Sequence, residues 1–220
     1  MRRYDAGMER LRLYGTPLSH FTRKIRILLT ELGVDFELVR PTSLLTTSTD
    51  GYGENPLMRV PTLEHRGVRL FDSDHIARYV VSVFDPEDRF GVRTEDPCDL
   101  NRLAVVQGIM DNEVVLILAK RGGLEDVESV AYFRKLSTAI ENGLAWLDAH
   151  TPLEQARFDY GDMATLCMWQ HVAHYGIAKS LERYPRVAAR VARFAERPSV
   201  VRTTPEASLA DATAAGWKPA

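Results

Sequence analysis

The sequence predicts an α/β domain followed by an all-α domain. Up to residue 84, short apolar stretches of strand type alternate with segments of helical period, whereas beyond residue 97 apolar residues recur only at helical spacing. Between them lies a stretch with Pro86, Gly91 and Pro97, which is typical of a linker. We therefore expect domains at 1–84 and 98–220, joined by a linker at 85–97.

The overall composition is that of an ordinary globular protein. The chain has 220 residues, of which 45% are hydrophobic and 26% charged, with a net charge of −2. This length allows a sizeable core, and the near-neutral charge gives no support for nucleic-acid binding. Cys98 and Cys167 lie far apart without metal-ligand spacing, which favours a reducing compartment and predicts no metal site. The charged first residues and the absence of a long apolar run predict a cytoplasmic protein that does not span a membrane.

The first domain is expected to begin with a strand, a helix and a second strand. Leu11–Tyr14 is typical of a short strand, and a helix with an apolar face follows and stops at Gly33. Residues 36–39 alternate as a second strand. Because a βαβ unit joins parallel strands, we expect these two strands to pair in parallel.

A hairpin and a helix complete this domain. The predicted strands are Thr62–Glu64 and Arg69–Phe71, and a helix follows over Ser73–Phe84 with Asp72 or Ser73 as its N-cap. Pro61 lacks an N–H, so we expect it to begin an edge strand or to follow a turn into the strand. A cis bond there would turn the Val60 backbone toward a ligand. The order β-α-β-β-α is that of a thioredoxin-like domain. Residues 42–53 are expected to form a loop or a short helix.

The second domain is expected to be a helical bundle. Helices are predicted over residues 100–120 and around 133–147, another after a capping box at Asp159-Tyr160-Gly161-Asp162, and one from Tyr184-Pro185. An Asp at the first capping position buries a second carboxylate, which is costly unless it is fully hydrogen-bonded. A further set of basic residues at helical spacing predicts a solvated face: Arg186, Arg190, Arg193 and Arg197.

The stretch Asn55-Pro56-Leu57-Met58-Arg59-Val60-Pro61-Thr62-Leu63, with Leu70-Phe71-Asp72-Ser73-Asp74-His75-Ile76, resembles the glutathione-binding half of the cytosolic glutathione transferases. The resemblance covers about Leu11 to Pro205, and its two motifs are specific in combination. It implies glutathione as co-substrate. Val60 and Pro61 would then pair with the cysteinyl unit, Asp72 and Ser73 would hold the γ-glutamyl group, and Arg59 would meet the glycyl carboxylate.

Ser19 is the candidate catalytic residue. A hydroxyl at a helix N-terminus can donate a hydrogen bond, and the helix end adds positive potential. Both effects stabilise a bound glutathione thiolate. The resemblance places Ser19 where serine-type, bacterial-like members carry the activating hydroxyl. The alternative is that Ser19 only caps its helix, with Thr16 or Tyr14 as weaker candidates for the hydroxyl. His20 stands where relatives commonly have Pro, and it is expected to be an exposed first-turn residue.

The resemblance implies a glutathione transferase in which the thiolate of bound glutathione attacks a small, hydrophobic electrophile. It also implies a homodimer that serves detoxification. Two alternatives remain: a catalytically weak binding or regulatory protein of the same fold, and a glutathione-dependent isomerase or dehalogenase. Three other histidines are predicted to be structural or on the surface, namely His65, His75 and His171. Three residues of the second domain belong to helices that are expected to line an acceptor pocket or the core: Met110, Trp169 and His174.

Overall fold

The computed structural model describes residues 10–41, 47–124, 126–214 and 216. It confirms a thioredoxin-like domain followed by a helical one. The chain divides into two units: one comprises residues up to Arg89 together with those from Arg202 onward, and the other is Phe90–Val201. Residues 202–214, which the sequence places with the helical domain, thus group with the first unit.

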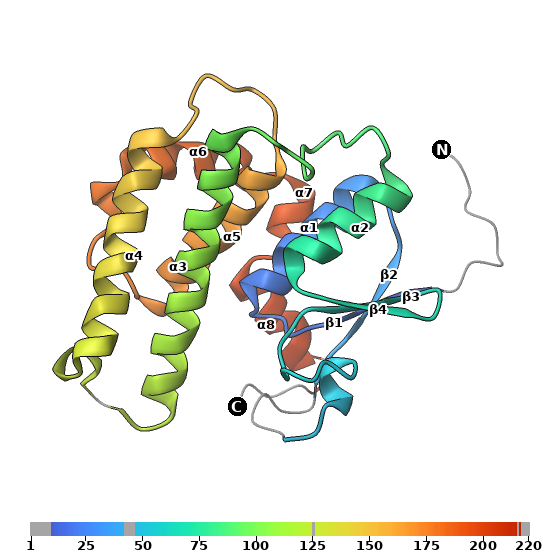
Figure 1. Cartoon of the computed structure of the whole chain (residues 1–220), viewed down its shortest axis with the longest axis horizontal. Helices are drawn as coiled ribbons and strands as arrows, with labels where there is room; N and C mark the ends of the chain where they lie inside the picture. The colour runs from blue at the N-terminus through green and yellow to red at the C-terminus, as the bar shows by residue number, and fades with distance from the viewer. Residues whose placement is uncertain (1–9, 42–46, 125, 215, 217–220) are drawn as a thin grey trace. The chain divides into compact units, whose positions relative to one another are not determined.

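The first unit is built on a mixed sheet (Figure 1). Its strands are β1 (Leu11–Tyr14), β2 (Phe36–Val39), β3 (Thr62–His65) and β4 (Val68–Phe71), in the order β2-β1-β3-β4. β1 and β2 are parallel, as predicted, and the other pairs are antiparallel. The predicted hairpin is confirmed with one more residue on each strand, because Arg66 and Gly67 both take positive φ and form the turn alone.

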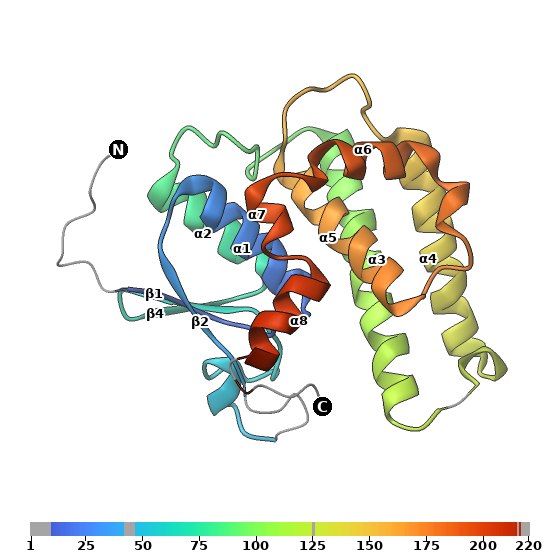
Figure 2. The same ribbon diagram turned by 180° about the vertical axis from the view of Figure 1, so that it is seen from behind.

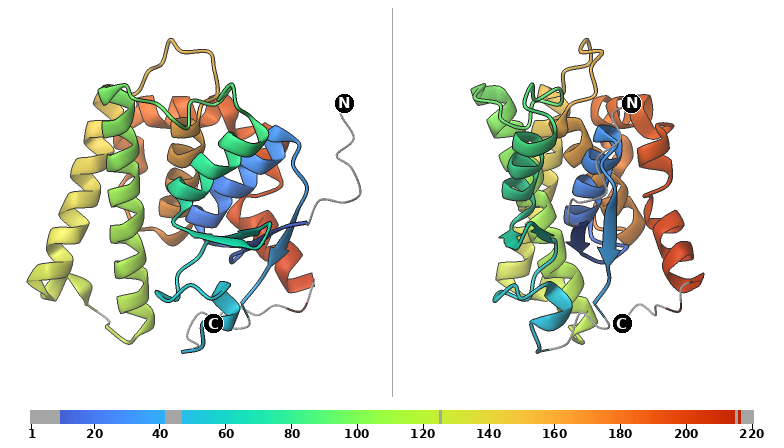
Figure 3. Two further views of the ribbon diagram at one scale, coloured as in Figure 1. Left: turned by 45° about the vertical axis from the view of Figure 1, so that its right-hand side comes forward. Right: turned by 90° about the vertical axis from the view of Figure 1, so that its right-hand side faces the viewer.

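Two helices lie side by side over one face of this sheet (Figures 1 and 3). α1 (His20–Leu32) begins at its N-cap Ser19 and ends at Gly33, whose φ of 68° suits a residue without Cβ. α2 (Ser73–Phe84) has Asp72 as its N-cap. Their apolar faces supply much of the unit's core, with full burial of Ile25, Leu28, Leu29, Ile76 and Val80. Of the loop predicted at 42–53, residues 42–46 lie outside the described residues and a short 3₁₀ helix, η1, spans Asp50–Tyr52.

A segment from the far end of the sequence completes the first unit. α8 (Pro205–Ala214) and the turn before it are tied to α1 (Figure 2). Arg23 Nε donates to Thr203 Oγ1 over 3.2 Å, and Arg26 donates to Ser208 Oγ over 3.0 Å. The helix that carries Ser19 at its start is therefore bonded, further along, to residues almost two hundred positions away.

The second unit is helical. Its helices are α3 (Pro97–Arg121), α4 (Ala131–His150), α5 (Tyr160–Tyr175), α6 (Pro185–Ala195) and α7 (Pro198–Val201), with 3₁₀ turns η2 (Val127–Ser129) and η3 (Leu181–Arg183). α3 and α4 run antiparallel beside each other (Figure 3). In the described part of the chain, no helix combines the length and apolar character that crossing a membrane requires.

The predicted capping box is confirmed at the start of α5. Asp159 accepts the Asp162 N–H over 2.7 Å, and Asp162 accepts the Asp159 N–H over 3.1 Å. Both carboxylates are also paired with buried guanidinium groups. Arg102 donates to Asp159 over 2.7 Å, and Arg190 donates twice to Asp162, over 2.8 and 2.6 Å. Arg190 is only 3% exposed, so the prediction of a fully solvated arginine face on α6 is wrong at this position.

Candidate functional site

The sheet brings the predicted site segments together at one end of its strands. Tyr14, the last residue of β1, pairs with Thr62, the first of β3, and Thr62 pairs with Phe71, the last of β4. The chain therefore leaves toward Ser19, arrives from Val60 and leaves again toward Asp72 at the same end of the sheet. Residues that are far apart in sequence meet at this end because the pairing register aligns the ends of the three strands.

Ser19 is confirmed as the N-cap of α1. Its Oγ accepts the Thr22 N–H over 3.2 Å, and its own N–H is held by Thr16 Oγ1, also over 3.2 Å. The cap uses Ser19 as an acceptor only, and its hydroxyl proton has no acceptor among the residues that the structure describes. Capping and donation to a ligand are therefore compatible. His20, next along the chain, is 2% exposed, so the expectation of an exposed histidine is wrong.

Tyr14 is poorly placed to activate a thiol. Its hydroxyl donates to Glu64 Oε2 over 3.2 Å, and Glu64 is itself paired with Arg12 and Arg69, over 3.5 and 3.2 Å. Burial, and next the Glu64 charge, raise the pKa of Tyr14 above its usual value. Its proton is thus already used inside the sheet, which leaves Ser19 and Thr16 as the hydroxyls near the start of α1.

The segment before β3 presents a backbone and a cation. The Val60–Pro61 peptide bond is cis, and Val60 precedes the β1–β3 register, which begins at Thr62. Arg59 is exposed and makes no ion pair with any described residue. This segment can therefore offer a peptide unit and a guanidinium to the same ligand.

The start of α2 has polar groups of both kinds. Asp72 takes a φ of 69° although it is not glycine, and its Oδ1 accepts the N–H groups of Asp74 and His75 over 2.8 and 3.2 Å. Such strained residues cluster at functional sites. Asp72 Oδ2 makes no hydrogen bond to the described residues. The Ser73 hydroxyl is buried and has no hydrogen-bond partner in the described parts of the chain. A buried hydroxyl of this kind is costly unless a ligand satisfies it.

An ion pair between a buried lysine and a partly exposed aspartate, which sequence reasoning missed, joins the two site helices. Lys24 on α1 is 1% exposed and its Nζ donates to Asp74 Oδ1 on α2 over 2.7 Å. The only sequence signal is a lysine beside Ile25 on the apolar side of α1. The pair fixes the first turn of α2, where Ser73 lies, against α1.

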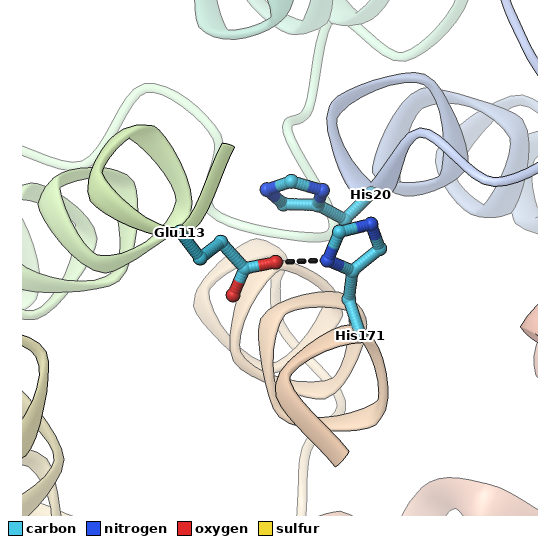
Figure 4. A group of neighbouring side chains, drawn as sticks. All are labelled: His20, Glu113 and His171. Atoms are coloured by element: carbon cyan, nitrogen blue, oxygen red, sulfur yellow. Dashed lines mark hydrogen bonds and ion pairs between the residues drawn. The ribbon is translucent and has the colours of Figure 1, made fainter. Parts of the chain in front are cut away.

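A second acidic and basic pair lies inside the helical unit. Glu113 on α3 contacts the Nδ1 atom of His171 on α5 (Figure 4). The Glu113 side chain is fully buried, and burial raises its pKa to about 9. Sequence reasoning took His171 as structural and did not single out Glu113, because 58 residues separate them. Of the helix residues considered for a pocket or the core, Met110 is buried and His174 is exposed.

Comparison with known proteins finds similarity to glutathione S-transferases. Residues 13–88 match the family model described as glutathione S-transferase, N-terminal domain. The structure is similar over 90% of this chain and 95% of the other, with a TM-score of 0.73 and 25% identity, to a Methylobacterium radiotolerans glutathione S-transferase in complex with glutathione sulfonate. Residues 13–88 of this chain are therefore similar to the N-terminal domain of the glutathione S-transferase family, and the chain shares the fold of solved glutathione S-transferases. Glutathione is the co-substrate of that family.

Other relatives extend the similarity along the chain. Glutathione S-transferase 3 of Zea mays is 37% identical over 83 residues, 36% of this chain and 37% of that protein, so the chain spans little more than a third of this curated relative. Glutathione S-transferase PARB of Nicotiana tabacum is 22% identical over 206 residues, 87% of this chain and 96% of that protein. A Methylobacillus flagellatus glutathione S-transferase with GSH bound has the same fold, with a TM-score of 0.74 and 24% identity.

Proposed function

We propose that this chain is a glutathione transferase that holds glutathione at the strand edge of its first unit and activates the thiol for attack on a small, hydrophobic electrophile. The observation that carries the proposal is the Ser73 hydroxyl, which is buried at a helix N-terminus with no hydrogen-bond partner among the described residues. A carboxylate is the ligand group that fits a hydroxyl donor and a positive helix end.

The γ-glutamyl end of glutathione fits the start of α2. Its α-carboxylate would accept from Ser73 Oγ in the positive potential of the helix N-terminus, while its ammonium would donate to Asp72. The Asp72 carboxylate has one oxygen engaged in capping and the other without a bond to the described residues, so it can receive a cation without losing its cap.

The rest of the tripeptide fits the segment before β3. The cysteinyl unit would pair with the Val60 backbone beside Pro61, and the glycyl carboxylate would meet Arg59. Arg59 suits this role because its guanidinium is exposed and makes no ion pair with a described residue, and because arginine binds a carboxylate through two parallel hydrogen bonds.

Ser19 would act on the sulfur. Its hydroxyl donates a hydrogen bond to the thiolate, and the N-terminus of α1 adds positive potential, so that more of the thiol is ionised at neutral pH. The thiolate then forms a carbon–sulfur bond with the electrophile, while the displaced group leaves with its electron pair or an addition product takes up a proton. Proximity and the lowered thiol pKa supply the acceleration. This makes the protein a serine-type member of its family.

We also propose a cytoplasmic homodimer. The first unit exposes an apolar group of side chains along the segment before β3 and on β4: Leu57, Met58, Val68 and Phe71. Exposed apolar groups of this kind mark interaction surfaces. Sedimentation equilibrium is expected to give twice the mass of one chain, and a mass of one chain at micromolar concentration contradicts the dimer.

The binding half of the proposal is tested by calorimetric titration of glutathione. Ser73→Ala is expected to weaken binding by about tenfold or more, since it removes a hydrogen bond to a charged group. Ser82→Ala is the matched control, because Ser82 lies on the same helix with an exposed hydroxyl whose one bond within the described part of the chain is to the Tyr79 C=O. Equal affinities in the wild type and Ser73→Ala contradict the assignment, and no binding to the wild type contradicts the ligand.

The activation half is tested by ultraviolet difference spectra of the glutathione thiolate across pH. We expect the wild type to show thiolate well below the pKa of the free thiol, Ser19→Thr to retain it and Ser19→Ala to lose it. Ser19→Asp keeps an acceptor for the helix cap but donates no proton at neutral pH, so it separates the two roles. If glutathione binds but remains a thiol, Ser19 is only a cap and the binding-protein alternative is favoured.

A further inference from the structure

The segment that carries Arg59 and Val60 has little regular structure of its own. Between the end of η1 and the start of β3, residues 53–61 form turns and bends, and residues 56–59 are exposed. Met58 also takes a positive φ, of 50°. Residues 56–59, with neither ladder bonds nor buried side chains, need other contacts to hold one conformation.

Asn55 supplies those contacts. Although polar, it is only 2% exposed. Its side-chain Nδ2 donates to the Arg59 C=O over 2.9 Å, and its Oδ1 accepts the Leu57 N–H over 3.0 Å. Its backbone C=O accepts the Met58 N–H over 2.9 Å. One buried residue thus bonds to three successive residues of the exposed segment.

The bond to the Arg59 carbonyl has the most direct consequence. That carbonyl belongs to the peptide unit that joins Arg59 to Val60, so the Asn55 amide sets the orientation of the Val60 N–H. It also fixes the backbone from which the Arg59 side chain extends. No other side chain reproduces the arrangement, because Asp lacks the donor, Ser is too short and Gln is one methylene longer.

We propose that Asn55 is a positioning residue for the peptide half of the glutathione site. It touches neither the sulfur nor the electrophile; it holds the Val60 peptide and Arg59 ready for the ligand. This inference rests on the proposed function. It extends that proposal by assigning glycine-side recognition to a buried amide that contacts only the protein.

The test compares two ligands on three variants. Calorimetry measures the affinity of glutathione and of γ-glutamylcysteine, which lacks the glycyl residue. Asn55→Asp keeps the acceptor for Leu57 but loses the donor to Arg59, and Asn55→Ser removes the same amide without adding charge, so one variant decides if the other fails to fold. Asn101→Asp, at an exposed position of α3, is the control for the change of charge.

We expect both Asn55 variants to bind glutathione about tenfold more weakly, while γ-glutamylcysteine loses less, so that the preference for glutathione shrinks. Combining Asn55→Asp with Arg59→Ala should weaken glutathione binding by less than the sum of the two separate effects, since both variants act on the contact between Arg59 and the glycyl carboxylate.

The possible failures are distinct. If the wild type does not bind glutathione, the proposed function falls and this inference with it. If the wild type binds but the Asn55 variants keep its affinity and its preference, Asn55 has no positioning role and the proposed function stands. An equal loss for both ligands also overturns the inference, since it indicates a general structural effect.

Discussion

The buried pair Arg190–Asp162 should be essential for the stability of the helical unit. Replacing Arg190 with Met removes two hydrogen bonds, of 2.8 and 2.6 Å, from a carboxylate whose side chain is 2% exposed. Arg102 alone, at 3.4 Å from Asp162, cannot compensate. Removing one partner of a buried ion pair costs about 3–5 kcal/mol. For a chain of this size, that cost corresponds to a fall in melting temperature of roughly 6–20 °C.

Urea unfolding followed by circular dichroism measures this loss. The control is Arg193→Met on the same helix, because Arg193 is exposed and, among the described residues, donates only to the Leu153 C=O, over 3.2 Å. We expect the control to change the free energy of unfolding by less than about 1 kcal/mol. The reasoning is refuted if Arg190→Met also costs less than about 1 kcal/mol, or no more than its control.

Three further predictions concern the same unit. Because burial raises the folded-state pKa of Glu113 to about 9 from 4.5, the unfolded chain loses this proton first as pH rises, and stability should fall by up to about 1.4 kcal/mol per pH unit within that window. Glu113→Gln should lack this slope, as urea unfolding at pH 5 and 8 would show; parallel slopes contradict the assignment. In Gly161→Ala, the new Cβ would clash with Arg102 Nη2 and displace the guanidinium, which should lower the free energy of unfolding by about 1–3 kcal/mol. An unchanged melting temperature contradicts this. Asp148 accepts the N–H groups of Arg186 and Val187 at the start of α6. Asp148→Ala should therefore lower the free energy of unfolding by about 1 kcal/mol, whereas Asp148→Asn should retain most of the stability of the wild type in the same thermal melt.

Local patterns were enough to predict most of the fold. The helix from His20 to Leu32 follows from apolar spacing and from Gly33, and the α5 capping box follows from two aspartates three residues apart. The same local chemistry placed Asp72 and Ser73 at the start of α2. These predictions held because each feature depends on neighbours within one or two turns of the chain.

The features that were missed depend on contacts between distant residues. Arg190 has the spacing of a solvated arginine, and only the fold brings it to Asp162, 28 residues away. The pairing of Lys24 with Asp74 across 50 residues is invisible to a periodicity argument for the same reason. Asn55 was missed differently: its partners are local, but its burial is not a property of the sequence motif.

The bonding of α8 to α1 has a consequence for how the protein is made. α1 is translated early, yet Thr203 and Ser208, which Arg23 and Arg26 contact, come only after residues 90–201. At ordinary translation rates that interval lasts roughly 6–20 s. During it, the nascent first unit lacks one of its own helices while the whole second unit is being synthesised. The two units therefore cannot mature in the order in which they begin, and the first unit is the last to be finished.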